Sequence, residues 1–460
     1  MNSSNSMQQL AKPKLTVIDA IAQSLAIGPV LSAGLLAGLI AGAAGSAAPL
    51  STILGSIGSI CVGWVIVLFA RQYTGAGAIY DYVRRSAGAT LGLFSAGIYF
   101  IGAMFLGGAG IFLAIGFFAN LTFAGYLGIN LPWWVWSLVA IGIVFAANHF
   151  GVQTTTRTQL ILTAFAVLPV IIIVLAVIFS GGAHGNTLEV FNPGHPKAGN
   201  IFTGVLFAVT LFIGFEASAS LSEETADPKR TVPFAVLGTV LIASIFYVIV
   251  VYAGAIGYGV DNIAQWADPA NPSQLGTLGN KFVGGWIAPW MDFAIIIDMI
   301  AVGSAFTATA ARGWFALARH NLLPKSMATV SSYGTPIGGN ILVTSLAVLL
   351  VVVTLISGVD SIVMFGASAL TGTLLISSIY IVLGVLAFRL VPANAPWQYL
   401  ILVGAIITPL LAIYGSVATV PLFPIAMNNI GVWLTFAGIV ISGIWTASMG
   451  TNLGKIVTTE

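Results

Sequence analysis

Charged side chains are scarce in this sequence: Asp, Glu, Lys and Arg together make up 6% of its 460 residues. A soluble domain carries about 25%, so the composition excludes a soluble globular protein. Three stretches, residues 20–70, 86–156 and 390–454, contain no charged residue at all. Each is more than twice as long as the roughly 20 residues that a membrane-spanning helix needs. The pattern therefore predicts an all-α polytopic membrane protein.

Cysteine and histidine are nearly absent as well. The single cysteine, Cys61, has no partner for a disulfide within the chain, and the four histidines show no spacing typical of a metal site. No arrangement of nucleophile, base and acid indicates catalysis. The net charge of +2 does not indicate a nucleic-acid partner. We therefore expect a protein that is not an enzyme and needs no cofactor or metal.

What the chain has in abundance is apolar sequence, with 58% hydrophobic residues. Apolar runs of spanning length predict twelve transmembrane helices. They lie near residues 16–44, 48–70, 92–118, 132–149, 158–180, 200–222, 234–258, 283–311, 338–357, 361–387, 399–420 and 430–449. An even number of spans puts both termini on one side of the membrane, and every basic residue except Lys197 and Lys281 falls on that side. Basic loops are typically cytoplasmic, so we expect both termini in the cytoplasm.

The two ends of the chain are polar. The first 15 residues have no cleavage site after a short apolar core, so we interpret them as a cytoplasmic tail and not as a signal peptide. We divide the remainder into a transport core at 16–387, two further helices at 388–450 and a second tail at 451–460. The short termini favour a plasma membrane, the inner membrane of a prokaryote.

The first and sixth predicted spans are each interrupted. The first contains Gly28-Pro29, and proline removes a hydrogen-bond donor and clashes with the preceding turn of a helix. The sixth contains Gly214-Phe215-Glu216 near its middle. Paired interruptions at corresponding positions of two halves are typical of transporters whose substrate binds at the centre of the membrane. The alternative is two kinked packing helices, because Gly and Pro are common in spanning helices.

Three stretches carry a resemblance to a known family. They are "TGAGAIYDYVRRSAG" (74–88), "FIGFEASASLSEETADPKRTVP" (212–233) and "AARGWFALARHNLLPKSMATVSSYGTPIGGN" (310–340). In sequence, order and spacing they resemble signatures of the amino acid–polyamine–organocation permeases. That resemblance implies a five-plus-five inverted repeat in the leucine-transporter-type fold, with helices 1 and 6 discontinuous and two further helices. It also implies alternating access and an amino acid or related amine as substrate.

The resemblance also implies a binding site between the two interruptions. The substrate's carboxylate would meet backbone N–H groups near Ser32, Ala33 and Gly34, just after Gly28. Its ammonium would meet carbonyl groups of both helices. The carbonyls are those near Ala26, Ile27, Phe212 and Ile213, with Gly214, Phe215 and Glu216 beside them. Some proton-coupled members carry a lysine in the fifth span, and this chain has no charge there, so coupling by such a lysine is excluded.

Two acidic residues lie deep within predicted spans, Glu216 in the sixth and Asp298 in the eighth. An ionisable residue within a membrane is a candidate functional residue by default. Either carboxyl group could carry a proton during transport, and either could instead be a fixed hydrogen-bond acceptor. The hydroxyl groups of Ser304 and Thr307 are weaker candidates for sodium ligands, since Ser and Thr more often bond to their own helix.

We therefore predict a secondary active transporter of amino acids that works by proton-coupled symport or by substrate exchange. Neutral amino acids are favoured, because the predicted site contains no basic residue and only two acids. A transporter or antiporter of cationic amino acids or polyamines is the alternative, and an ion channel is a more remote one. Protons and the lipid bilayer are the other expected partners, and the oligomeric state stays open.

Overall fold

The computed structural model describes residue 10 and residues 14–268, 273–418 and 422–449. Within these ranges the chain is helical, and β-structure is limited to two isolated bridges, Leu15 with Thr225 and Gly45 with Ala198. Eleven helices of the described residues are long and apolar enough to cross a membrane. The prediction of a polytopic helical membrane protein is thus confirmed.

The eleven candidate spans follow the order of the predicted ones. They are Val17–Ala44 (α1, Val17–Ser24, to α3, Ala37–Ala44), Ala48–Gln72 (α4), Ala89–Leu127 (α6, Ala89–Ala103, and α7, Ile111–Leu127), Thr156–Ser180 within α9 (Val152–Ser180), Ile201–Glu224 (α10, Ile201–Thr210, and η6, Phe215–Glu224), Pro228–Tyr258 (α11), Ile287–Arg319 (α14), Ile337–Ser357 (α15), Ser361–Leu390 (α16, Ser361–Ala387, with its last turn), Gln398–Val417 (within α17, Gln398–Ala418) and Ile430–Ser448 (α18). The predicted fourth span corresponds to a shorter apolar helix of 17 residues, Trp133–His149 (α8). The count of twelve spans stays a prediction.

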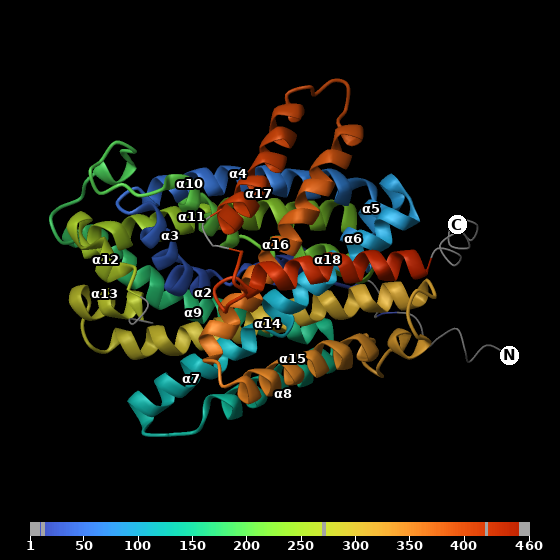
Figure 1. Cartoon of the computed structure of the whole chain (residues 1–460), viewed down its shortest axis with the longest axis horizontal. Coiled ribbons are helices and arrows are strands. Elements are labelled where there is room, and N and C mark those ends of the chain that lie inside the picture. Colours follow the sequence, from blue (N-terminus) through green and yellow to red (C-terminus); the bar gives the residue numbers. More distant parts are fainter. Residues whose placement is uncertain (1–9, 11–13, 269–272, 419–421, 450–460) are drawn as a thin grey trace.

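Three short helices lie in the connections between the spans. They are α5 (Ile79–Ala87), α12 (Ile263–Trp266) and α13 (Gln274–Phe282). Figure 1 shows α2 (Pro29–Leu31) and α14 in the middle of the molecule, with α8 and α15 along one edge. The spans α6–α7 and α14 bury 83% of their most apolar stretch, against 33% for α15 and 28% for α18. The first two therefore form the interior, and the last two have the exposed apolar surface expected of helices that face lipid.

The first span is broken at the predicted glycine. Helix α1 ends at Ser24, a 3-10 turn covers Leu25–Ile27, and Gly28 adopts a left-handed conformation with φ +61° and ψ +72°. The helix restarts at Pro29 with α2 (Pro29–Leu31), continues through a π-helical turn (Ser32–Leu36) and ends as α3. The left-handed region is open to glycine at little cost, and Pro29 suits the first helical position because its missing N–H needs no partner there.

The sixth span is broken in the same manner. Helix α10 ends at Thr210, residues 211–214 form a turn, and Gly214 has φ +119°. The chain then continues as the 3-10 helix η6. Both interruptions therefore occur where a glycine adopts backbone angles that L-residues with a side chain rarely take.

The third span also departs from regular geometry, which the sequence did not predict. A π-helical turn at Met104–Gly108 separates α6 from α7. Gly107 lies directly against Phe306 of α14, so closely that a Cβ atom there would be 2.2 Å from the aromatic ring. The missing side chain at Gly107 therefore lets α14 approach the third span closely.

Candidate functional site

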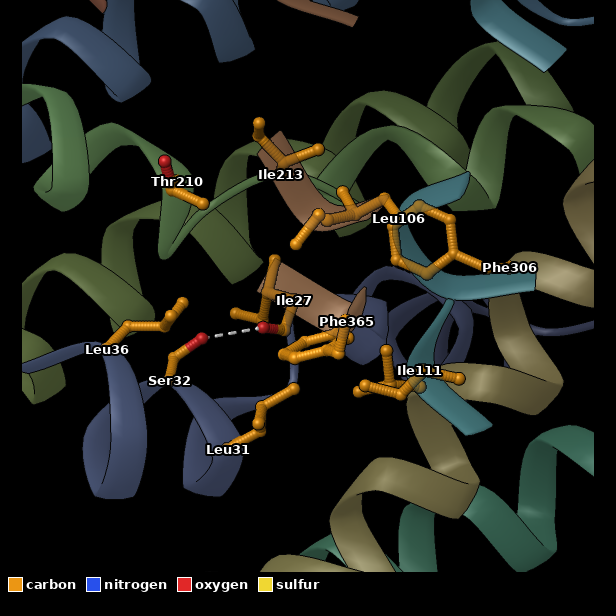
Figure 2. A pocket seen from close by; sticks show the side chains of 12 residues that line it. Ile27, Leu31, Ser32, Leu36, Leu106, Ile111, Thr210, Ile213, Phe306 and Phe365 are labelled. Atoms are coloured by element: carbon orange, nitrogen blue, oxygen red, sulfur yellow. Dashed lines mark hydrogen bonds between the residues drawn. The ribbon is translucent and has the colours of Figure 1, made fainter. Parts of the chain in front are cut away.

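A small cavity of about 50 Å³ lies between the two broken helices. Figure 2 shows the side chains that line it, which are almost all apolar. The first span contributes Ile27, Leu31, Ser32 and Leu36; the third contributes Leu106 and Ile111; the sixth contributes Thr210 and Ile213; α14 contributes Val302 and Phe306; and α16 contributes Phe365 and Ala369. A cavity of this size holds a few water molecules, so a larger ligand requires these walls to move.

Ser32 connects the two breaks across this cavity. Its hydroxyl group donates to the carbonyl oxygen of Ile27 at 3.0 Å, the bond drawn in Figure 2, and lies 3.5 Å from the carbonyl oxygen of Leu211. Both carbonyls belong to helix ends that the breaks leave open. The two breaks therefore face one space, and of the predicted site residues Ile27, Ser32 and Ile213 line it.

Other predicted site residues lie around the breaks without lining the cavity. Phe212 packs edge-on against Tyr247, with ring centroids 5.2 Å apart, and Phe215 stacks on Tyr380 at 6.0 Å. Ala33 is buried, and Gly34 packs against Ile295 of α14. The side chain of Ala26 lies outside the described part of the chain. Sequence reasoning missed the cavity walls from the third span, α14 and α16, since apolar residues there look like ordinary core.

A second, larger cavity of about 280 Å³ adjoins the first. It lies between α3, α10, α16 and α17, and it shares Leu36, Thr210, Phe365 and Ala369 with the smaller cavity. Its lining is also apolar, apart from Thr210, Thr373 and Ser416. The four shared residues therefore form a wall that the two cavities have in common.

Glu216 is buried at the second break, with 1% of its surface exposed. One carboxyl oxygen accepts a hydrogen bond from the backbone N–H of Gly214 at 3.1 Å, and the other accepts one from the hydroxyl group of Tyr99 at 3.0 Å. The hydroxyl group of Tyr380 is also buried and interacts electrostatically with the carboxyl group of Glu216, but it does not form a hydrogen bond with it. Glu216 thus binds a backbone N–H freed by the break, in line with its interpretation as a fixed acceptor.

Asp298 of α14 plays the corresponding part at the first break. One of its oxygens accepts hydrogen bonds from the backbone N–H groups of Val30 and Leu31, at 2.9 and 2.8 Å. Its other oxygen, Oδ1, is buried and has no hydrogen-bond partner. A carboxylate at this position satisfies N–H groups that the start of a helix leaves free.

The N–H groups bound by Asp298 lie before those expected to meet a substrate, which are near Ser32, Ala33 and Gly34. The N–H of Ser32 bonds to the carbonyl oxygen of Gly28 at 2.8 Å, and Ala33 and Gly34 lie within the π-helical turn. The helix restarts at Pro29, directly after the break, so its first donors belong to Val30 and Leu31.

The two candidate sodium ligands have different surroundings. The hydroxyl group of Ser304 is hydrogen-bonded by the side chain of Asn148 from α8 at 3.2 Å, and the hydroxyl group of Thr307 is buried without a partner. Within the described ranges no group of three His, Cys, Asp or Glu residues could hold a metal ion. Ser304 is thus engaged with α8 and not with the first span.

The three stretches that carry the family resemblance converge at one end of the bundle. Glu223 and Glu224 at the end of η6 form ion pairs with Arg319 and Arg312 of α14, each with a shortest N–O distance of 2.6 Å. Glu223 also accepts from the N–H of Ala76, in the loop before α5, at 2.9 Å. Polar contacts therefore fasten this end of the sixth span to α14 and to the loop after the second span.

Asp81 of α5 belongs to this polar end and lies outside the spans. It accepts a hydrogen bond from the N–H of Gly77 at 3.0 Å and lies 3.5 Å from the guanidinium group of Arg84. Burial raises the pKa of Asp81 to about 6, against the lowering effect of Arg84 and Arg85, and Glu223 raises it further. Folding therefore favours the protonated carboxyl group, which is the reverse of the usual situation for an aspartate.

A pH dependence of stability follows from this pKa. The folded-state pKa lies above the unfolded value of 3.8, so the stabilising contribution is present below that value and is lost as the pH rises through about 6. Thermal unfolding of the wild type should therefore lose midpoint temperature between pH 4.5 and pH 7.5, relative to Asp81→Asn. Asp261→Asn, at an exposed position, is the control. Parallel pH profiles for the wild type and Asp81→Asn would contradict this prediction.

Comparisons with known proteins agree with this architecture. A family model described as "Amino acid permease" matches residues 20–445. The chain is 24% identical over 280 residues to a branched-chain amino acid permease of Bacillus subtilis and 25% identical over 308 residues to a low-affinity putrescine importer of Escherichia coli. These alignments cover 60% and 65% of this chain but only 54% and 65% of the relatives, so the chain spans less than two thirds of either relative's length.

A third relative is covered more fully. The branched-chain amino acid permease of Lactococcus lactis is 25% identical over 415 residues, which is 82% of both chains. The family model covers nearly the whole chain, including both breaks and all three converging stretches. The chain therefore belongs to the amino acid permease family, within the amino acid–polyamine–organocation superfamily.

Proposed function

We propose that the protein is a secondary active transporter that carries a small amino acid or amine across the membrane by alternating access. The observation that carries this proposal is the pair of breaks at positive-φ glycines, Gly28 and Gly214, which face one cavity from the first and sixth spans. Non-helical backbone at membrane depth is tolerated only where protein or a water-filled space satisfies its polar groups. Two such breaks around one space are suited to a substrate with polar groups.

The remainder of the architecture is proposed on the same basis. Twelve spans, with α8 as the fourth, would form a core of two five-helix repeats at 16–387, followed by α17 and α18 within 388–450. The basic end, where Arg312 and Arg319 lie, would face the cytoplasm, with both termini on that side of a plasma membrane. The larger cavity beside α3, α10, α16 and α17 would then be the route from the outside.

Movement of the substrate requires the two ends to open in turn. In this structure the end with the Glu223 and Glu224 ion pairs is held together by buried and half-buried contacts. We propose that these contacts break when that end opens, while Phe365 and its neighbours close the other route. Glu216 and Asp298 are the proposed coupling groups, since each can bind a proton or lie beside the amino group of the substrate.

The relatives suggest the range of substrates to test. Their names specify branched-chain amino acids for two of them and putrescine for a third. We propose a substrate from this range, a small molecule with an amino group and an apolar or short aliphatic body. The apolar lining of both cavities supports this choice, and neutral amino acids and organic cations are the two classes to distinguish.

Counterflow in proteoliposomes tests the proposal. Vesicles containing the purified protein are loaded with unlabelled amino acids or diamines, and uptake of the same labelled compound is followed at pH 5.5 and pH 7.5. We expect transient accumulation of at least one labelled compound, chemically unchanged, above that of protein-free vesicles. Absence of counterflow with every compound would refute transport, and ion conductance without counterflow would indicate a channel.

A further inference from the structure

The first break offers no N–H group to a substrate carboxylate. Pro29 has no N–H, the N–H groups of Val30 and Leu31 are both bound by Asp298, and that of Ser32 is bound by the carbonyl oxygen of Gly28. A helix start with free donors would attract an anion. Here the protein's own carboxylate, from a helix 268 residues further along the chain, already occupies that position.

The second break is occupied in the same way. The N–H of Gly214 is bound by Glu216, that of Phe215 by the carbonyl oxygen of Phe212 at 3.2 Å, and that of Ala217 by the carbonyl oxygen of Gly214 at 3.0 Å. The backbone N–H of Glu216 interacts with its own carboxyl group. None of these backbone N–H groups is therefore left for a second carboxylate.

The buried charges at the two breaks, which lie beside the cavity without lining it, are one-sided. Among the buried acids of the described residues, Glu224 lies 2.6 Å from Arg312, Asp81 lies 3.5 Å from Arg84 and Asp19 lies 4.0 Å from Arg157. Asp298 and Glu216 are as deeply buried, at 1% exposure each, and the described part of the chain places no basic side chain beside either. A buried carboxylate without a cation is costly, so a cation from outside would be stabilised here.

One free acceptor beside the first break also suits a cation. Oδ1 of Asp298 has no partner and can accept a hydrogen bond from an ammonium group. The side chains that surround the cavity are apolar, including Ile27, Leu31 and Phe306. Such a wall can contact an alkyl chain, but it has no group that would replace the water around a carboxylate.

We infer that the transported substrate is a small organic amine without a carboxylate group, an inference that rests on the proposed transport function. An amine presents its ammonium to the carboxylates at the breaks and its alkyl chain to the apolar wall. An amino acid would bring a further carboxylate to a site that has two and whose backbone N–H groups at the breaks are already bound. While Asp298 and Glu216 are ionised, repulsion between like charges is strong in surroundings of low dielectric constant, so the amino acid binds more weakly than the matching amine.

Matched pairs of compounds test this inference, because the members of each pair differ only by the carboxylate. The pairs are isopentylamine with leucine, and putrescine with ornithine. Thermal unfolding of the purified protein and competition in counterflow are measured with each compound at pH 7.5. We expect at least one amine to raise the unfolding midpoint and to compete, because a ligand that binds the folded state stabilises it. The matching amino acid should do neither at the same concentration.

Variants at the two acids add a second readout. Asp298→Asn keeps an acceptor for Val30 and Leu31 but removes the charge, and we expect it to bind the active amine at least about tenfold more weakly. Asp292→Asn is the control on the same helix, because Asp292 bonds to Tyr126 and Ser273 away from the breaks. Equal loss in both variants would show that the effect is not specific to the site.

The outcomes separate this inference from the proposed function. If the amino acids bind and are exchanged as well as their amines or better, the inference is wrong and transport stands. If no compound of either class binds or is exchanged, the proposed function itself fails. Should Asp298→Asn not fold, the comparison of matched pairs on the wild type still decides, since it needs no variant.

Discussion

Replacement of Glu224 by glutamine is expected to destabilise the protein by about 3–5 kcal/mol. Glu224 is 1% exposed, and its carboxylate binds Arg312, whose side chain is 3% exposed, at 2.6 and 3.4 Å. Glutamine has almost the same shape but no charge, so the guanidinium group of Arg312 would remain buried without a counter-charge. The penalty for that buried charge is the source of the expected loss. The measurement is thermal unfolding of the detergent-solubilised protein.

The neighbouring residue provides a matched control. Glu223 also pairs with an arginine, Arg319, at 2.6 Å, but these two side chains are 28% and 27% exposed. Exposed ion pairs contribute about 0–1 kcal/mol, so Glu223→Gln should be mild although it removes the same charge one position earlier. Equal destabilisation by the two substitutions would contradict the argument from burial.

A double variant distinguishes the cost of an unpaired charge from the value of the pair. If both Glu224 and Arg312 are replaced by methionine, no buried charge is left alone, and such replacements are often neutral or stabilising. We therefore expect the double variant to be more stable than Glu224→Gln. Because this pair fastens the sixth span to α14, the double variant should also show a changed transport rate. If the loss of midpoint temperature in the double variant equals the sum of the losses in the two single variants, the two residues act independently.

Substitution of either break glycine by alanine is expected to abolish most transport. Gly28 has φ +61°, and a Cβ atom there would lie 2.6 Å from a methyl group of Val302. The left-handed conformation alone costs an L-residue about 1–2 kcal/mol, and the steric conflict adds to this. Gly214, with φ +119°, is outside the left-handed helical region that other residues tolerate. Each substitution should displace the N–H groups that Asp298 or Glu216 binds.

Counterflow at equal protein density checks this expectation, and Gly238→Ala is the control. Gly238 lies within α11, and a Cβ atom there meets nothing within 4 Å, so alanine should be neutral or slightly stabilising by about 0.5–1 kcal/mol. We expect transport by Gly28→Ala and Gly214→Ala to fall at least about tenfold, which corresponds to about 1.4 kcal/mol. Full transport by both variants would show that neither break is needed.

Much of the fold could be predicted because its causes are local. Apolar runs of spanning length predicted helices close to those observed, and the sixth, for example, was expected at 200–222 and is found at Ile201–Glu224. Both breaks were predicted because glycine and proline act on their own backbone angles, whatever surrounds them. The π-helical turn in the third span was not, and neither was the close contact of Gly107 with Phe306, far away in the sequence.

The candidate site was predictable only in outline. Sequence marked Glu216 and Asp298 as unusual, because a carboxyl group within an apolar helix needs a reason. It did not reveal that Asp298 binds Val30 and Leu31, nor that Phe306 and Phe365 complete the cavity. It also placed the free donors at Ser32–Gly34, because the residue at which the helix restarts depends on the conformation of Gly28.

The sequence by itself thus determined that this protein crosses a membrane many times and that its first and sixth spans are broken, since hydrophobicity and backbone preference are properties of each segment. Only the tertiary structure decided what the breaks bind. Glu224 and Asp298 are both buried acids in a chain with few charges, yet one lies against an arginine and the other against two backbone N–H groups. That difference arises from contacts through space between distant helices, which no local pattern encodes.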